Sequence, residues 1–348
     1  MKLIIPKGYK PRMTVKETHQ AIERIKDEFR GALLENLNLV RASHAVVLRA
    51  GTGVNDDLNG VEKPVEFATP DGDRWQLPQS LAKWKRQALA DYGYKPGEGI
   101  WTDMTAVRPD DMRGNLHSIY VDQWDWEKVM DPEERHIDFL KSTVRKIYAA
   151  IKRTAATVEG KYGVNVGLAP EIEFITTEQL QRNYPKIKDP KALENEIVRE
   201  AKSVFLIGIG YPLKDGEPNL EGKPHDGRAP DYDDWSTPNS LGGRGLNGDI
   251  LVWNPLFGSA LELSSMGIRV NKQSLLWQCE IRGTNDRLEL PFHKRILNGE
   301  LPQTIGGGVG QSRLSMLLLQ KAHIGEVQVG AWPDKMRAEL AQHGIQLL

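Results

Sequence analysis

The residues most suggestive of chemistry form a glycine run that ends in an arginine. Positions 306–313 read Gly-Gly-Gly-Val-Gly-Gln-Ser-Arg. The run is not a P-loop, because no Gly-Lys-Ser/Thr follows, and it lacks the third glycine of the dinucleotide fingerprint. Bare backbone lets a flat aromatic ligand approach closely, and Arg313 could stack on a purine or bind phosphate. The pattern favours a nucleotide site about as much as a glycine-rich turn before a core helix.

The segment 118–127 combines strand-forming residues with polar ones, as Ser-Ile-Tyr-Val-Asp-Gln-Trp-Asp-Trp-Glu. Alternate residues of a strand share a face, so Val121, Gln123 and Asp125 point one way, and Asp122 and two tryptophans point the other. A face that carries Gln and Asp within such a segment indicates a site for a polar ligand. An edge strand with a solvated polar face is the less favoured alternative.

Four acidic residues gather between positions 228 and 253. Asp231, Asp233 and Asp234 lie close together, and Asp249 lies in a later apolar stretch. Such a cluster suits ammonium groups, or Mg²⁺ bound together with phosphate. Because Asp favours turns and helix caps, we expect Asp231 and Asp234 to have that structural role.

The segment 261–269 places a carboxylate and an arginine near each other. Alternation along a strand puts Glu262 and Ser264 on the same face, and Arg269 is expected to follow a turn at Gly267. A carboxylate and an arginine at the edge of one site can hold a metal-bound phosphate and a substrate carboxylate, respectively.

Two N-terminal pieces are also candidates. Residues 51–60 form a polar, glycine-flanked loop, and residues 79–87 read as the basic start of a helix. Lys83 or Lys85 could meet an anion there, although a solvated helix face is the favoured interpretation for Lys83 and Arg86. The histidines show no metal-ligand spacing, and isolated histidines are more often structural.

Three helices can be predicted that would position these residues. Thr14 and Glu17 form a capping box before an apolar stripe of helical period. Asp131, as N-cap, and Pro132 predict the start of a second helix. Residues 311–320 predict a third, strongly apolar helix that follows directly on the glycine run.

Short β-rich runs predict the strands, and several neighbours are joined by loops too short for a crossover helix. Antiparallel pairing therefore fits better than a doubly wound parallel sheet. We predict an α+β fold, an antiparallel sheet flanked by helices, in a single domain over residues 1–348, with a long loop over 211–230. The predicted strands are Trp101–Val107, Ser118–Trp124, Glu171–Thr176, Val204–Ile209, Asp249–Trp253, Ala260–Leu263 and Glu326–Ala331.

Composition narrows the class of protein. The sequence has 46 Lys and Arg residues and 47 Asp and Glu residues, so its net charge is −1. This balance argues against a protein whose main role is to bind nucleic acid. The single cysteine, Cys279, can form neither an internal disulfide nor a cysteine-based zinc site. The chain has no apolar run long enough to cross a bilayer. We expect a cytoplasmic protein with no membrane or nucleic-acid partner.

Taken together, the segments resemble the ammonia-dependent asparagine synthetases, the bacterial A-type aspartate–ammonia ligases. That family is related to the catalytic core of class II aminoacyl-tRNA synthetases, above all the aspartyl and asparaginyl enzymes. The matching strings occur in family order between residues 80 and 319. They are residues 80–87, 117–127, 228–238, 245–255, 262–270 and 302–319.

The resemblance implies a class II synthetase-like sheet and a homodimer. It also implies a reaction of L-aspartate, ATP and ammonia that passes through a β-aspartyl-adenylate and gives L-asparagine, AMP and diphosphate, with Mg²⁺. Adenylation suits this chemistry. Ammonia cannot displace oxide from the β-carboxylate, because oxide is a poor leaving group, but it can displace AMP from the β-aspartyl-adenylate.

The resemblance also implies site residues by motif match. Those expected around aspartate are Asp56, Ser80, Lys85, Gln123, Asp125, Asp233 and Arg269. Those expected around the adenylate are Arg108, Leu116, Val121, Asp249, Leu263, Ser264, Ser265, Gly310 and Arg313. Asp249 and Glu262 are expected near the metal. The expected catalytic residues are Asp56, Arg108, Gln123, Asp233 and Asp249.

Some alternatives stay open at this point. The functional acid of the 51–60 loop is assigned to Asp56, but Asp57 is its neighbour. A class II aminoacyl-tRNA synthetase is the second hypothesis, and a catalytically inactive paralogue is the third. Glutamine as nitrogen donor is disfavoured, because glutamine-dependent synthetases carry an N-terminal cysteine nucleophile and this chain begins Met-Lys-Leu.

Overall fold

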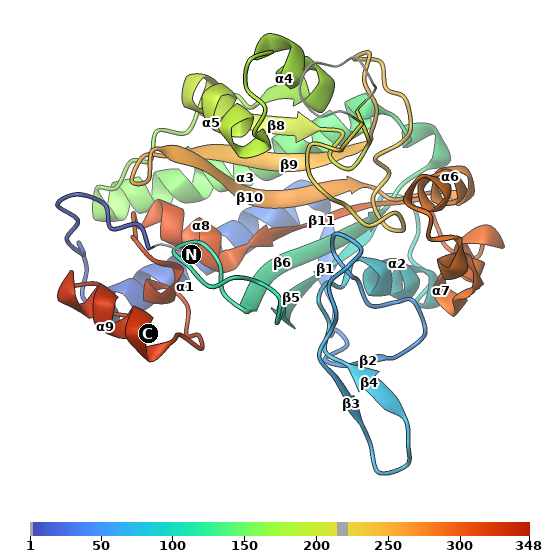
Figure 1. Cartoon of the computed structure of the whole chain (residues 1–348), viewed down its shortest axis with the longest axis horizontal. Helices are drawn as coiled ribbons and strands as arrows, with labels where there is room; N and C mark the ends of the chain where they lie inside the picture. Colours follow the sequence, from blue (N-terminus) through green and yellow to red (C-terminus); the bar gives the residue numbers. More distant parts are fainter. Residues whose placement is uncertain (1–2, 214–221) are drawn as a thin grey trace.

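A computed structural model describes residues 3–213 and 222–348. Its centre is an eight-stranded sheet with the order β1-β5-β6-β11-β10-β9-β8-β7 (Figure 1). In that order the strands are β1 (Leu39–Arg41), β5 (Gly99–Val107), β6 (Tyr120–Val129), β11 (Thr304–Gly310), β10 (Ser259–Ile268), β9 (Asn247–Asn254), β8 (Ser203–Ile207) and β7 (Glu173–Thr176).

The pairing confirms the predicted fold class. The strands from β5 to β8 pair antiparallel. Only the two pairs at the ends of the sheet, β1 with β5 and β7 with β8, are parallel among the described residues. Each of these pairs is linked through at least one helix, as a parallel connection requires. The sequence pattern did not predict the parallel ends.

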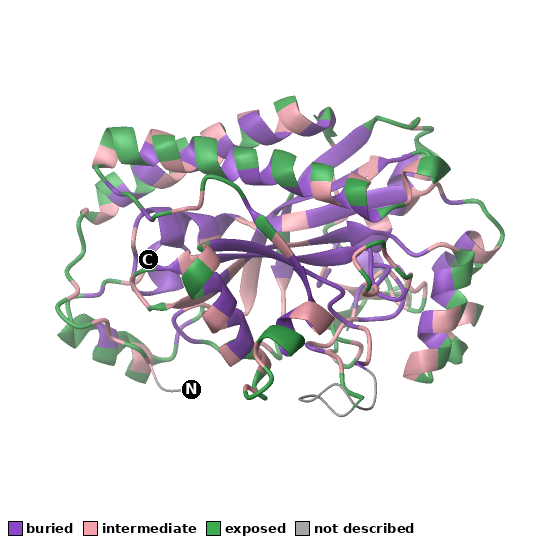
Figure 2. Cartoon of the chain, turned by 90° about the horizontal axis from the view of Figure 1, so that it is seen from above, coloured by how far each residue is buried: buried purple, intermediate pink, exposed green. Residues whose placement is uncertain are grey.

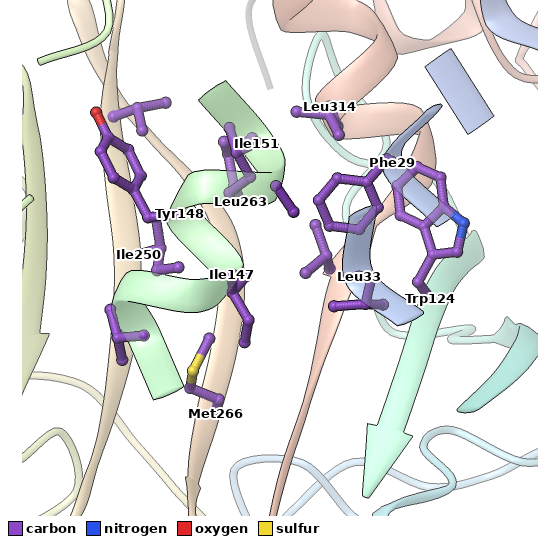
Figure 3. Close-up of a cluster of buried hydrophobic side chains, with 14 of the residues drawn as sticks. Phe29, Leu33, Trp124, Ile147, Tyr148, Ile151, Ile250, Leu263, Met266 and Leu314 are labelled. Carbon is purple, nitrogen blue, oxygen red and sulfur yellow. The ribbon is translucent and has the colours of Figure 1, made fainter. Parts of the chain in front are cut away.

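Helices α1 (Val15–Leu37) and α3 (Ile137–Tyr162) cover one face of the sheet. The apolar stripe of α1 packs against Trp124, whose ring centroid lies 4.4 Å from that of Phe29. Figure 3 shows this core, in which side chains of both helices and of α8 (Gln311–Leu318) meet side chains of the central strands. Burial of this large apolar surface is the main stabilising contribution to the fold.

The other face of the sheet carries polar side chains, and shorter helices cover its two ends. Helix α2 (Ala82–Asp91) packs on β5 and β6, and α5 (Pro190–Ala201) packs on β9 and β10, beside α4 (Thr177–Asn183). The central strands are mostly buried, while the outer helices alternate buried and exposed residues (Figure 2). The middle of this face is therefore a polar interior between two helical flanks.

A small second sheet extends from the body below β1 (Figure 1). It pairs β2 (Leu48–Arg49), β4 (Arg74–Gln76) and β3 (Glu66–Ala68) in that order. The 51–60 loop follows β2 directly. The remaining helices are α6 (Lys272–Arg282), α7 (Pro291–Leu297), α9 (Asp334–Gln342) and three 3₁₀ turns at Pro132–Glu134, Asn285–Glu289 and Ile324–Glu326.

The predicted start of one helix and one predicted strand are wrong. The capping box at Asp131 opens only a 3₁₀ turn, because Arg135 leaves helical geometry at φ −73° and ψ 65°, and α3 begins after His136. The predicted strand Glu326–Ala331 is instead a 3₁₀ turn and irregular chain. There Glu326 accepts hydrogen bonds from the backbone of Ala322 and His323, so its carboxylate caps a turn.

The ends of the other predicted helices and strands agree with the structure to within five residues, and the third predicted helix is α8. Positions 214–221 of the predicted 211–230 loop lie outside the described residues. Within the part of the chain that is described, none of the helices combines the length and the apolar character that crossing a membrane demands.

Candidate active site

A cleft lies on the polar face of the sheet, where β6, β10 and β11 meet the start of α8. Seven residues of the predicted adenylate and metal sets line it, and Gln123 lines it as well. Those seven are Arg108, Leu116, Val121, Glu262, Leu263, Gly310 and Arg313. Asp249, Ser264 and Ser265 of the predicted sets do not line it.

The glycine run is β11 itself, and its glycines lie opposite the polar residues of β6. Gly310 pairs with Gln123, Gly308 with Asp125 and Gly306 with Glu127. A Cβ atom on Gly308 would lie only 2.3 Å from Oε1 of Gln123. The polar side chains of β6 therefore occupy the space that side chains on β11 would take, which is a physical reason for the run of glycines.

Arg108 and Arg313 lie at two sides of the cleft. Arg313 is in the first turn of α8, and its Nη1 lies 3.5 Å from Oε2 of Glu262. The guanidinium of Arg108 donates from Nε and Nη2 to the carbonyl oxygen of Gln79, at 3.1 and 3.0 Å. Neither guanidinium is fully buried, so both retain donors for an anionic ligand.

Asp249 lies beside the cleft on β9. Its Oδ2 accepts from Nη2 of Arg228 at 2.6 Å, and its buried Oδ1 has no hydrogen-bond partner among the described residues. Burial and the Glu262 carboxylate together raise the pKa of Asp249 to about 6, against the opposing effect of Arg228. Carboxylate oxygens are the ligands that Mg²⁺ prefers, so Asp249 and Glu262 fit the metal that the family implies.

A β-bulge in β10 corrects the prediction for Ser264. The register shifts between Glu262 and Ser264, so Ser265 pairs with Asp249, and Ser264 pairs with the core residue Ile250. Glu262 and Ser265 therefore share the site face, and the side chain of Ser264 points into the opposite core. One extra residue reverses the alternation beyond it, and the simple alternation assumed for this strand was wrong.

Next to the cleft lies a buried network of charges beneath α2. Nζ of Lys85 donates to Oδ1 of Asp125 at 2.5 Å and lies 3.8 Å from Oε2 of Glu127. Arg269 donates to both oxygens of Glu127, at 3.0 and 2.7 Å, and it also pairs with Asp233. Four of the residues predicted around aspartate, Lys85, Asp125, Asp233 and Arg269, are thus joined in one network.

The predicted turn at Gly267 is wrong, because Gly267 is inside β10 and Arg269 follows the end of the strand. Arg269 forms an isolated bridge with Asp233 instead, and a Cβ atom on Gly267 would lie 2.9 Å from Oδ1 of Asp233. The strand thus extends as far as the charge network and positions Arg269 within it.

Asp56 lies at the edge of this network rather than inside it. Its neighbours are Lys83, Asp57 and Asp231, and burial raises its pKa to about 6 although Lys83 opposes that shift. The half-buried Tyr232 lies near both Asp56 and Asp233, and both carboxylates contribute to the raised pKa of Tyr232. Tyr232 therefore interacts electrostatically both with Asp56 and with Asp233 of the network around Arg269.

Asp57 and Ser80 have more local contacts. Both carboxylate oxygens of Asp57 pair with Arg287 at the rim of the loop. Ser80 accepts a hydrogen bond from the backbone of Ala82 at 3.2 Å, just before α2. Ser80 follows Gln79 in the chain, and Nε2 of Gln79 donates to the carbonyl oxygen of Asp56 at 2.9 Å.

The structure overturns the structural expectations for Lys83, Arg86 and Asp231 and confirms the one for Asp234. Lys83 and Arg86 are only 3% and 2% exposed, so they do not form a solvated helix face. Asp231 caps no turn, because its Oδ2 accepts from Lys83 at 2.7 Å and from His293 at 2.8 Å. Asp234 does have the predicted role, since Oδ1 accepts from the backbone of residues 236 and 237.

Sequence reasoning assigned no role to Glu127, Arg228 or His117. Glu127 continues the alternation of Gln123 and Asp125, so period-two counting could have found it. Arg228 pairs with Asp249, 21 residues away, and no local pattern predicts that pair. His117 is exposed at the cleft, where partial desolvation and the nearby Arg313 lower its pKa.

The fold is similar to that of class II aminoacyl-tRNA synthetases. Asparaginyl-tRNA synthetase of Pyrococcus horikoshii, solved with asparaginyl-adenylate, has a TM-score of 0.63 at 16% identity, over 93% of this chain and 71% of that one. Asparaginyl-tRNA synthetase of Entamoeba histolytica gives 0.63 at 13% identity, over 90% and 67%. The chain therefore has a class II synthetase-like fold.

The particular family follows from sequence comparison. The aspartate–ammonia ligase family model matches residues 16–344. Proteins named aspartate–ammonia ligase are 50% identical in Parabacteroides distasonis, over 99% of each chain, and 48% identical in Lactobacillus johnsonii, over all of each chain. The chain belongs to the aspartate–ammonia ligase family.

Proposed function

We propose that this chain amidates L-aspartate with ammonia to give L-asparagine, and that it does so through a β-aspartyl-adenylate with release of AMP and diphosphate. The observation that carries the proposal is the contact between two sites: a cleft with two arginines adjoins a buried network of paired acids and bases. Gln123 belongs to both, because it lines the cleft and follows the alternation of Asp125.

The network supplies the groups that L-aspartate needs. An α-ammonium requires carboxylates, which Asp125 and Asp233 provide, and two substrate carboxylates require cations, which Lys85 and Arg269 provide. Each of these groups is already paired with an opposite charge. Substrate binding therefore exchanges one buried ion pair for another, which avoids leaving an unpaired charge in the interior.

The cleft supplies the groups that ATP needs. In the proposed step the β-carboxylate attacks the α-phosphorus in line, and negative charge spreads over the phosphate oxygens. Arg108, which now donates to a carbonyl of the chain, turns to the α-phosphate, and Arg313 stacks on adenine. Mg²⁺ bound by Asp249 and Glu262 would neutralise part of the phosphate charge.

The second step needs a base and a dry site, because ammonium must lose a proton before it can attack. We assign the base to Asp56 rather than Asp57. Asp56 is 3% exposed and has a raised pKa, whereas Arg287 engages both oxygens of Asp57. A carboxylate with a raised pKa is a better proton acceptor near neutral pH.

Aspartate-dependent exchange of labelled diphosphate into ATP tests the first step, because only an adenylate mechanism exchanges diphosphate before ammonia is added. Transfer of ¹⁸O from the aspartate carboxylate to AMP is the expected outcome. Transfer to inorganic phosphate would mean an acyl-phosphate mechanism and would refute the proposal. A parallel assay of tRNA charging with aspartate and asparagine tests the synthetase alternative, and we expect no charging.

We also propose that the protein works as a cytoplasmic homodimer. Val40 on the edge strand β1 and Val46 just beyond it are 61% and 67% exposed. Apolar side chains on an edge strand are usually covered in the working state of a protein. Light scattering coupled to size exclusion, with Val40→Glu as the disrupting variant, measures the assembly state directly.

A further inference from the structure

A second cavity opens beneath the 51–60 loop, and it shares no lining residue with the nucleotide cleft. Acidic side chains are prominent in its lining, and Asp56 is one of them. Four carboxylates face two cations, so two negative charges are in excess when all of them are ionised and His293 is neutral. The charged residues of the lining are Asp56, Asp57, Glu62, Asp231, Lys83 and Arg287.

Three of the carboxylates converge. Ligand oxygens of Asp56, Asp57 and Asp231 all lie within 4.8 Å of one another. Arg287 engages both oxygens of Asp57, and Oδ2 of Asp231 accepts from Lys83, Arg287 and His293. Few oxygens remain free, which suits a small cation that donates hydrogen bonds better than Mg²⁺, which demands near-octahedral coordination.

Two buried acceptors in the lining have no partner among the described residues. Oδ1 of Asp231, a residue 1% exposed, accepts no hydrogen bond, and Nδ1 of the fully buried His293 has none either. Nδ1 of His293 faces Gly53, another lining residue, where a Cβ atom would lie 2.9 Å from it. In a neutral ring whose Nε2 donates to Asp231, Nδ1 is an acceptor. Buried acceptors are normally hydrogen-bonded, so these two atoms favour a ligand that donates hydrogen bonds.

Lys83 shows that the cavity already holds an ammonium group. Its Nζ donates to Oδ2 of Asp231 at 2.7 Å and to the carbonyl oxygen of Asn55 at 3.4 Å. Burial lowers the pKa of Lys83, but Asp231, Asp56 and Asp57 outweigh burial and hold it above its usual value. The same surroundings would stabilise a free ammonium ion for the same reason.

We propose that this cavity is the entry and holding site for ammonium, which reaches the reaction through an opening separate from the nucleotide cleft and yields its proton to Asp56. The inference rests on the proposed function. Ammonium and the Asp56 carboxylate become ammonia and a carboxylic acid. The nitrogen lone pair then forms the bond to the acyl carbon, the carbon–oxygen bond to AMP breaks with its electrons on AMP, and the proton lost from the new amide nitrogen passes to AMP or solvent.

A separate entrance has a physical rationale. Once the adenylate has formed, it fills the cleft that carries Arg108 and Arg313, and ammonium cannot pass it. An acidic cavity concentrates a small cation and disfavours anions. The nucleophile can thus be stored next to the acyl group while the nucleotide side stays closed to water.

Steady-state kinetics of charge-removing variants test the inference. Asp57→Asn and Glu62→Gln should each raise KM for ammonium about three- to tenfold, the effect of losing one nearby carboxylate. Aspartate-dependent ATP–diphosphate exchange should stay within about twofold of wild type. Asp73→Asn is the matched control, because Asp73 is an acid of the same small-sheet region, paired with Arg49, and does not line the cavity. An unchanged KM for ammonium in both variants would overturn the inference.

Hydroxylamine as an alternative nucleophile distinguishes the loss of a cation site from damage to the 51–60 loop. It is largely neutral at pH 7.5, so its binding needs no cation site. The two variants should leave KM for hydroxylamine unchanged. An equal rise for both nucleophiles would show a damaged loop and would refute the cation site. If wild type shows no aspartate-dependent exchange at all, the proposed function has failed instead of this inference.

Thallous ion, which resembles ammonium in charge and size, gives a direct structural readout. Crystals of the full chain soaked in Tl⁺ should show an anomalous peak near Oδ1 of Asp231, and ammonium should displace it. The peak should weaken in Asp57→Asn. A peak only elsewhere, or no peak at all, would contradict the assignment of this cavity.

Discussion

Gly306 and Glu127 lie directly opposite each other on β11 and β6, and a methyl group on Gly306 would lie 1.9 Å from Oε2 of Glu127. The same methyl group would lie 2.6 Å from Nη2 of Arg269, which pairs with Glu127. The absence of a side chain at one position therefore makes room for the buried ion pair that the charge network needs.

Gly306→Ala should accordingly displace the Glu127–Arg269 pair. We expect KM for aspartate to rise at least about tenfold and the free energy of unfolding to fall by about 1–3 kcal/mol, the usual range for overpacking. Chemical denaturation and substrate titration measure the two effects. Gly160→Ala is the control, because Gly160 is in α3 with nothing within 4 Å of the added Cβ. A normal KM in Gly306→Ala would show that the pair does not position aspartate.

Arg108→Ala should slow adenylate formation by about 10²–10³-fold, the usual cost of removing one preorganised donor to a developing charge. The fold should be unaffected, because among the described residues the Arg108 guanidinium donates only to the carbonyl oxygen of Gln79. ATP–diphosphate exchange is the measurement. Arg113→Ala, which removes an exposed arginine that donates to the carbonyl of Ala331, should leave the exchange rate unchanged. Exchange near the wild-type rate in Arg108→Ala would remove this arginine from the reaction.

Asp56→Asn should form the adenylate normally but transfer it poorly to ammonia, and single-turnover kinetics resolve the two steps. Because burial raises the pKa of Asp56 to about 6, the ammonia step of wild type should slow as pH falls through that value. If adenylation slows instead, and the ammonia step does not, then Asp56 belongs to aspartate binding.

The same pKa has a consequence for stability, and its sign can be worked out. A carboxyl whose pKa is higher in the folded than in the unfolded state binds protons more tightly when folded, so it costs stability as pH rises from about 4 to about 6. Asp56→Asn should therefore be more stable than wild type at pH 7, and this gain should disappear near pH 4. Thermal unfolding at the two pH values measures the difference. A loss of stability at pH 7 would mean that the Lys83 interaction outweighs burial.

Asp249→Asn should raise the Mg²⁺ concentration needed for half-maximal activity by at least about tenfold, because it removes one charged oxygen ligand. Glu280→Gln, on the exposed side of α6, should not change the Mg²⁺ requirement. Activity titrated with Mg²⁺ at saturating aspartate is the measurement. An unchanged requirement in Asp249→Asn would place the metal elsewhere.

The sequence by itself determined the fold class, the helix after the glycine run and the family. Those properties depend on short-range patterns: the capping box at Thr14, strand alternation around Gln123, and loops too short for crossovers. Alternation also placed Gln123 and Asp125 on one face, where the structure has them opposite Gly310 and Gly308. Such patterns need only the geometry of one element or of neighbouring strands.

The tertiary structure alone decided which charged residues meet. Asp231 is 148 residues from Lys83, and the burial of both depends on how the 51–60 loop packs on the segment before α6. The bulge in β10, which turns Ser264 away from the site, depends on the register of two neighbouring strands. Asp56 and Asp57 are adjacent, similar acids in the sequence, and only their surroundings distinguish them. Burial and ion pairing are properties of distant segments brought together, and no local pattern encodes them.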